Sequence, residues 1–139
     1  DEAIRDFNNL LNINPESALA LRQRALIYRN QGLLTQALRD LNTAKKLNPN
    51  DDAIRMDLGI ALRISGQYKH AENELNEAIR LNSKNYIAFQ ERGRIKYLLK
   101  QYHEALIDLD NAINLDQESS FAWHGRAEIK LELNRNEEA

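Results

Sequence analysis

The sequence predicts an all-α solenoid, a fold in which one small helical unit is stacked on itself along the chain. The first observation is a repeat marked by alanines that are each 34 residues from the next, namely Ala3, Ala37, Ala71, Ala105 and Ala139. The second is that each period holds two stretches with apolar residues at helical spacing. The third is a turn signal between the two stretches. Together these indicate stacked pairs of helices.

The first complete unit illustrates the plan. Its apolar residues fall in two runs at helical spacing, Leu21, Ala25 and Tyr28, then Ala37, Leu41 and Ala44. Gly32 lies between the runs and suits a helix end that needs a positive φ. Pro49 marks the end of the second helix, because proline disfavours helix at the residue before it. The third unit has Lys100 where a glycine is expected, yet its apolar spacing persists.

The period predicts one solenoid segment over residues 1–139. We expect the second helix of a truncated repeat at 1–17, full repeats at 18–51, 52–85 and 86–119, and the first helix of a truncated repeat at 120–139. Because the chain does not begin with methionine and starts in mid-repeat, we interpret it as a piece of a longer protein.

Small and large residues alternate at fixed places, which is a packing pattern for antiparallel helix pairs. Gly59 and Gly93, with Ala25 and Ala127 at the same place, should let a neighbouring helix approach closely. We expect larger residues to fill the gaps, in two series: Phe7, Leu41, Leu75 and Leu109, and Ile13, Leu47, Leu81 and Leu115.

This pattern resembles the tetratricopeptide repeat (TPR). The residues that carry the resemblance are Leu21, Arg24-Ala25, Tyr28, Ala37, Leu41, Ala44 and Pro49 in the first unit; Leu58-Gly59, Leu62, Tyr68, Ala71, Leu75 and Ala78 in the second; Phe89, Arg92-Gly93, Tyr102, Ala105, Leu109 and Ala112 in the third; and Trp123 and Arg126-Ala127 in the last. The resemblance implies a right-handed superhelix of helix pairs whose first helices line a concave groove. It also implies binding of proteins or peptides.

The same resemblance assigns one face of each first helix to the groove. The residues are Leu19, Arg22, Leu26 and Arg29; Ala53, Met56, Ile60 and Arg63; Ile87, Gln90, Arg94 and Tyr97; and Phe121, His124, Glu128 and Leu131. Many are apolar although they lie off the packing face, and four are arginines, whereas Glu128 is the one acid. We therefore expect an acidic peptide with apolar anchors as the partner. The alternative is that the arginines are solvated and the apolar residues pack on adjoining helices.

A groove that holds a C-terminal carboxylate pair with lysine, asparagine and arginine is known in the TPR family. At the matching places this chain has Arg22 with Leu26, Asp57, and Ile87 with Glu91. The asparagines are missing and the two acids would repel a carboxylate, so this clamp is not expected.

Charged residues also recur at fixed places. Arg24, Arg92 and Arg126 share one place, and an acid is always found at another, in Asp6, Asp40, Glu74 and Asp108. We favour a repeated ion pair at the helix interface over a ligand role. Whether each arginine reaches the acid of its own unit or that of the preceding unit stays open. Leu58 breaks the arginine series, so one acid must lack this partner.

Composition excludes several classes of function. The net charge of the 139 residues is −2, which gives no general reason to expect nucleic acid or an anionic membrane as a partner. There is no cysteine, and no apolar run approaches the ~20 residues of a membrane span. His70, His103 and His124 are scattered and are expected to be exposed rather than metal-bound. We expect no cofactor, no enzymatic activity and a cytoplasmic location.

Two functions remain. The first is an interaction scaffold that binds a peptide or protein segment in the groove. The alternative is a structural segment that stacks on a parent protein or on another copy. Since Asp1-Glu2-Ala3 and Glu138-Ala139 are nearly the same point of the repeat, the two ends are complementary. We expect head-to-tail self-association with Phe7 and Trp123 near the contact.

Overall fold

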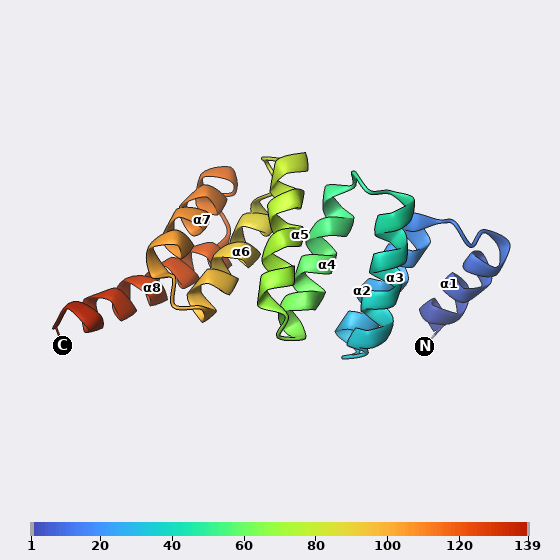
Figure 1. Ribbon diagram of the computed structural model, residues 1–139, viewed down its shortest axis with the longest axis horizontal. Helices are drawn as coiled ribbons and strands as arrows, with labels where there is room; N and C mark the ends of the chain where they lie inside the picture. Colours follow the sequence, from blue (N-terminus) through green and yellow to red (C-terminus); the bar gives the residue numbers. More distant parts are fainter. Residues whose placement is uncertain (1, 139) are drawn as a thin grey trace. The chain divides into compact units, whose positions relative to one another are not determined.

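The protein is all helical in a computed structural model that describes the backbone of residues 2–138 and side chains as far as residue 136 (Figure 1). Within these residues there are eight helices and no strand. They are α1 (Glu2–Ile13), α2 (Ala18–Asn30), α3 (Leu34–Leu47), α4 (Asp52–Ile64), α5 (Tyr68–Leu81), α6 (Tyr86–Leu98), α7 (Tyr102–Leu115) and α8 (Ser120–Glu138). Ala139, the last member of the alanine series, lies outside the described residues.

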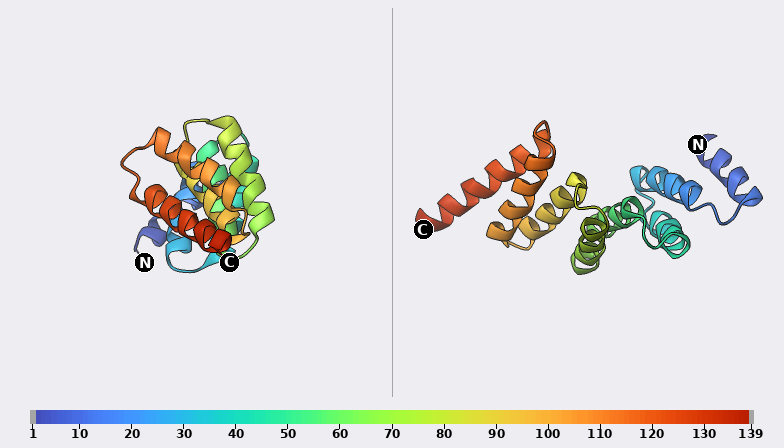
Figure 2. Two further views of the ribbon diagram at one scale, coloured as in Figure 1. Left: turned by 90° about the vertical axis from the view of Figure 1, so that its left-hand side faces the viewer. Right: turned by 90° about the horizontal axis from the view of Figure 1, so that it is seen from above.

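The chain divides into two compact units, one ending at Glu74 and the other beginning at Leu75, so the boundary lies inside α5. In the first unit, α2 packs against α1 and α3, and α3 packs against α4. In the second, α7 packs against both α6 and α8. Helices that follow one another within a unit run antiparallel (Figures 1 and 2). A single continuous segment over 1–139 stays a prediction.

Helix ends follow from local chemistry. The side chains of Ser17, Asp51, Asn85 and Ser119 cap the first helices, each accepting the N–H of the residue three positions on at 3.0–3.3 Å. The turns within the pairs need a positive φ after the first helix. Gly32 and Gly66 provide it at 77° and 80°, and Lys100 adopts 60° in the third full repeat.

The alanine series packs as the period predicts. Ala37, Ala71 and Ala105 are fully buried, and so are the leucines four residues after each of them. The expectation for the second series of large residues was wrong. Ile13 is 83% exposed, and Leu47 and Leu115 are also exposed, because each ends its helix beyond the packed face.

The small residues do permit a close approach. A Cβ atom added to Gly93 would lie 3.2 Å from Leu109 Cγ and 3.3 Å from the carbonyl oxygen of Ala105. Gly59 and Ala25 are buried at the same place in their units, whereas Ala127 is exposed. In the second unit, this contact places Leu109 of α7 directly beneath the face that α6 and α8 expose.

Candidate functional site

In the first unit, ion pairs cross the predicted groove face between α2 and α4. Arg22 and Arg29 on α2 both reach Asp57 on α4, with Nε–Oδ2 at 2.5 Å and Nη1–Oδ1 at 3.7 Å. The Asp57 side chain is only 4% exposed. Its burial raises the pKa of this carboxyl, and the two guanidinium groups act in the opposite direction. Two of the four predicted groove arginines are therefore engaged within the protein.

The remaining predicted groove residues of this unit are mostly half-buried. Leu26, Met56, Ile60 and Arg63 retain part of their surface, and Leu19 is exposed. The apolar part of the prediction is therefore present as partly accessible surface. The basic part is smaller than predicted, because Arg22 and Arg29 pair with Asp57, which was not recognised as their partner. From its place in the family's carboxylate clamp, Asp57 was expected only to repel a carboxylate.

In the second unit, the corresponding face is hollow. A pocket of about 350 Å³ lies between α6 and α8. Five predicted groove residues line it, and these are Arg94, Tyr97, Phe121, His124 and Glu128. The structure thus brings together the aromatic, basic and acidic members of the predicted set around one cavity.

Glycine on both helices gives the pocket its depth. Gly93 and Gly125 line it from α6 and α8, and the side chain of Leu109 lies against both. A Cβ atom at Gly125 would be 3.2 Å from Leu109 Cδ1. Leu98 and Ile129 complete the apolar lining. Sequence reasoning missed Gly125, although it occupies the same place in the repeat as Asp57 and Glu91.

The rim of the pocket is aromatic and charged. The Arg94 guanidinium carbon lies 5.3 Å from the centre of the Phe121 ring, a cation–π arrangement. His124 Nε2 and Glu128 Oε1 are 3.4 Å apart along α8. Desolvation, with the carboxylates of Glu128 and Glu132, raises the pKa of Tyr97. The rim therefore has a cationic end at Arg94 and an acidic side along α8.

Gln90 was predicted to lie on the groove face, but it does not line the pocket. Its side chain is buried, and its Nε2 donates to Ser119 Oγ at 3.0 Å. Since Ser119 also caps α8, this hydrogen bond ties α6 to the start of α8. Gln90 thus fixes the frame of the pocket rather than lining it.

The recurring arginines settle the question left open by the sequence. Arg24 binds Asp40 of its own repeat through Nε and Nη2, both at 2.7 Å, and its Nη1 donates to Asn8 of the preceding repeat. Arg92 forms the same arrangement with Asp108 of its own repeat and Asn76 of the preceding repeat. Each arginine thus contacts the helices on both sides of its own.

Arg126 follows half of this pattern. Its Nε lies 3.0 Å from Asp110, which stands at the place of Asn8 and Asn76. Lys96 also binds Asp108, at 2.8 Å. The recurring charges are therefore part of the packing between helices, as the ion-pair interpretation expected.

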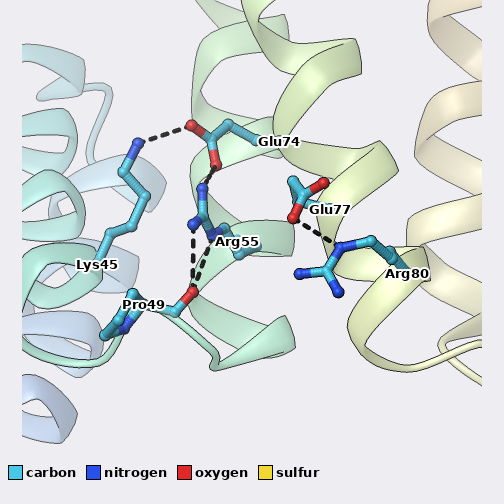
Figure 3. A network of polar contacts seen from close by, with 6 residues as sticks. All are labelled: Lys45, Pro49, Arg55, Glu74, Glu77 and Arg80. Atoms are coloured by element: carbon cyan, nitrogen blue, oxygen red, sulfur yellow. Dashed lines mark hydrogen bonds and ion pairs between the residues drawn. The ribbon is translucent and has the colours of Figure 1, made fainter.

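Where Leu58 breaks the arginine series, other cations hold the acid. Glu74 Oε1 lies 2.7 Å from Lys45 Nζ, and Oε2 lies 2.8 Å from Arg55 Nη1 (Figure 3). Arg55 also donates to the carbonyl oxygen of Pro49 through two nitrogens at 3.2 Å. Burial would raise the pKa of Glu74, but the hydrogen bonds and charges of both cations lower it overall.

This substitution of partners has a signal in the sequence that was not used. Lys45 and Arg55 occupy the places that Leu11 and Leu21 hold one repeat earlier, where both leucines are buried in one apolar cluster. An apolar contact between consecutive helices has thus become a pair of cations on α3 and α4, and the usual arginine of α4 has become Leu58.

The residues assigned to the end-to-end contact have mixed surroundings. Trp123 is 48% exposed and its Nε1 donates to the carbonyl oxygen of Gln117, while Phe7 is half-buried. Ala3 and Leu10 are exposed. Ile129, which was expected to be bare, is 1% exposed, because it packs in the apolar cluster of the second unit. Head-to-tail association stays a prediction.

The described residues hold no group of three His, Asp or Glu side chains that could bind a metal ion. All three histidines are exposed, as expected. Among the described helices, none is both long enough and apolar enough to cross a lipid bilayer.

Comparison with known proteins agrees with the geometry. The tetratricopeptide-repeat family model matches residues 20–51 and 53–85. The chain has a tetratricopeptide-repeat fold. A search of curated protein sequences finds no significant match.

Solved TPR structures superpose well on the chain. The first TPR domain of Spaghetti (RPAP3), bound to the HSP90 peptide SRMEEVD, has a TM-score of 0.81 at 22% identity, over 84% of this chain and 93% of that one. MamA has a TM-score of 0.85 at 19% identity, over 94% and 77%. The second TPR domain of human RPAP3, in complex with the HSP70 peptide SGPTIEEVD, has a TM-score of 0.76 at 20% identity, over 81% and 94%. At these identities the likeness concerns the fold.

Proposed function

We propose that this TPR chain is a protein-interaction scaffold that binds a peptide or protein segment on the exposed face of its first helices. The observation that carries the proposal is the pocket between α6 and α8, which is lined by five residues assigned to the groove from the sequence. A concave site with an apolar floor and a few charged groups at its rim is typical of ligand-binding sites. No enzymatic activity is proposed.

TPR domains of similar fold bind chaperone peptides that end in EEVD. This chain differs at the places that would hold such a terminus. Asp57 is buried beside Arg22 and Arg29, so both arginines already have a carboxylate of the protein as partner. We therefore propose a partner other than an EEVD terminus, with apolar anchors and an acidic group.

Selection from a library of displayed random peptides tests this function, using the full 139-residue chain as bait. An enriched peptide is synthesised, and its affinity is measured by fluorescence anisotropy. Met56→Ser with Ile60→Ser removes apolar surface in the first unit, and Arg94→Glu reverses a rim charge in the second. Arg39→Glu, at an exposed position on α3, is the matched charge control.

We expect at least one of the two groove variants to weaken binding about tenfold or more, as truncation of a central contact does. Arg39→Glu should bind like the parent. Enrichment of no peptide, or equal affinity in all variants, would contradict the proposal.

A second candidate is a structural segment that assembles with another copy. It is favoured by the exposure of Trp123 and Ala127 on α8. Trp123 and Arg126 also border an open hollow of about 560 Å³. Sedimentation velocity at increasing concentration tests it: the parent should associate, and Trp123→Ser should stay monomeric.

A further inference from the structure

Gly125 is one of the two glycines that line the pocket of the second unit. Its counterpart one repeat earlier is Glu91, and two repeats earlier it is Asp57. The side chain of Asp57 forms ion pairs with Arg22 and Arg29. Gly125 has no side chain, so the backbone of α8 lies close to Leu109, and Gly125, Leu109, Tyr97 and Phe121 all line the pocket. The α6–α8 pair thus differs from the α2–α4 pair in the residue at this place beside the hollow.

The pocket is built for an apolar group. Its floor and sides come from Leu98, Leu109, Ile129 and the two aromatic rings. A volume of about 350 Å³ is near the lower end for small-ligand sites, so the pocket suits one bulky side chain rather than a helix. Burying such a side chain contributes to binding in proportion to the apolar area removed from water.

The rim carries both charges, with Glu128 beside His124 on α8 and Arg94 on α6. On α6, Arg92 and Lys96 are both held by Asp108, whereas Arg94 makes no ion pair within the described residues. Its guanidinium stacks on the Phe121 ring beside the opening. A stacked guanidinium still presents N–H groups at its edge, where they pair well with a carboxylate.

We propose that the α6–α8 pocket binds a bulky apolar side chain of the partner, and that Arg94 pairs with a carboxylate adjacent to this side chain. The inference rests on the proposed function and deepens it, because it names the anchor and the charge that the site recognises. Gly125 and Phe121 determine the shape of the pocket, and Arg94 determines the sign of the neighbouring charge.

Small probes test the pocket without a full ligand. The ¹⁵N-labelled 139-residue chain is titrated by NMR with 3-phenylpropionate, which carries a ring and a carboxylate. The comparison probes are 3-phenylpropylamine, which has the ring with a positive charge, and butyrate, which has the carboxylate without the ring. We expect 3-phenylpropionate to shift the amide signals of Gly93 and Gly125 at the lowest concentration of the three.

Variants separate the two parts of the site. Arg94→Glu should weaken 3-phenylpropionate about threefold or more, as expected for an exposed ion pair that is replaced by repulsion, and should favour the amine. Phe121→Ala should weaken both ring probes, and since Phe121 is 40% exposed its removal leaves the helix core intact. Gly125→Ala would alter the lining of the pocket more directly, but its Cβ atom would lie only 3.2 Å from Leu109 Cδ1. Arg39→Glu is again the control.

The outcomes distinguish this inference from the proposed function. Equal binding of the amine and the carboxylate, or no effect of Arg94→Glu and Phe121→Ala, overturns the pocket assignment. If a display-selected peptide still binds in that case, the interaction function stands and its site lies elsewhere on the first helices. If the probes bind as expected but no peptide is selected, the pocket stands and the wider proposal fails.

Discussion

The α2–α4 face of the first unit and the α6–α8 face of the second have the same backbone plan but opposite chemistry. In the first, Asp57 pairs with Arg22 and Arg29 across the face, and in the second a pocket lies between the helices and is lined by Gly125. The packing face beneath both is the same, with buried alanine and leucine at matching places. A repeat can thus keep its core constant while a few positions on its outer face change. Arg22, Arg29 and Asp57 form ion pairs in the first unit, whereas Gln90, Tyr97 and Gly125 stand at the same places in the second.

Reversing one arginine in each face gives the largest expected contrast. Arg22→Glu places a second carboxylate beside buried Asp57 and should lower the free energy of unfolding by about 3 kcal/mol, because the buried charge loses its main partner. Arg94→Glu changes an exposed rim residue and should stay within about 0.5 kcal/mol of the parent. Urea denaturation followed by circular dichroism measures both. Equal stability of the two variants would show that Arg22 is not needed by Asp57.

The shared packing face should respond alike in both units. Ala71→Leu and Ala105→Leu each insert bulk at a fully buried alanine and should destabilise by roughly 1–3 kcal/mol. Ala105 is also the residue whose carbonyl oxygen lies near Gly93. Thermal unfolding compares the two variants with Ala3→Leu, at an exposed member of the same series, as control. A variant that melts like the parent would refute the packing assignment at that site.

The turns give a smaller difference between the units. Gly32 and Gly66 take a positive φ without cost, but Lys100 takes it at 60°. Lys100→Gly should therefore stabilise by about 0.5–1 kcal/mol, because a side chain is disfavoured in the left-handed region. The reverse change, Gly66→Lys, should destabilise by a similar amount. Both are measured by urea denaturation, and a loss of stability in Lys100→Gly would contradict the explanation.

The smallest effect concerns pH and compares two acids of the first unit. The pKa of Glu74 is lowered in the folded state, so its contribution to stability is present above the unfolded pKa of about 4.5 and is lost as pH falls through the folded value. The pKa of Asp57 is raised, so its contribution has the opposite sign and is lost as pH rises. Between pH 6 and pH 3.5, Glu74→Gln should lose less stability than the parent, and Asp57→Asn should lose more. The same slope in all three proteins would contradict these directions.

The fold was predictable because it rests on spacing. The alanines, the turn glycines and the buried leucines recur every 34 residues, so their roles follow from position alone. The ion pairs were predictable in kind, but the choice of partner needed coordinates. Arg24 binds the acid of its own repeat, Asp40, which was one of the two alternatives, and its additional hydrogen bond to Asn8 was not foreseen.

The site was predictable only in part, because its key residues break the period. Asp57 and Gly125 occupy one place in the repeat, and comparing units emphasises what they share rather than where they differ. The same is true of Lys45 and Arg55, which replace an apolar pair. A search for departures from the repeat, carried out place by place, would have singled out all four residues.

The arginines that bridge three helices have a consequence for the way the chain opens. Separating α2 from either neighbour breaks the contacts of Arg24 with Asn8 or Asp40, and Glu74 links α3, α4 and α5 in a comparable way through Lys45 and Arg55. In a one-dimensional array, such links add to the coupling between neighbours and make unfolding more cooperative. Native-state hydrogen exchange should therefore report the helices of a bridge opening together, with similar protection across all three.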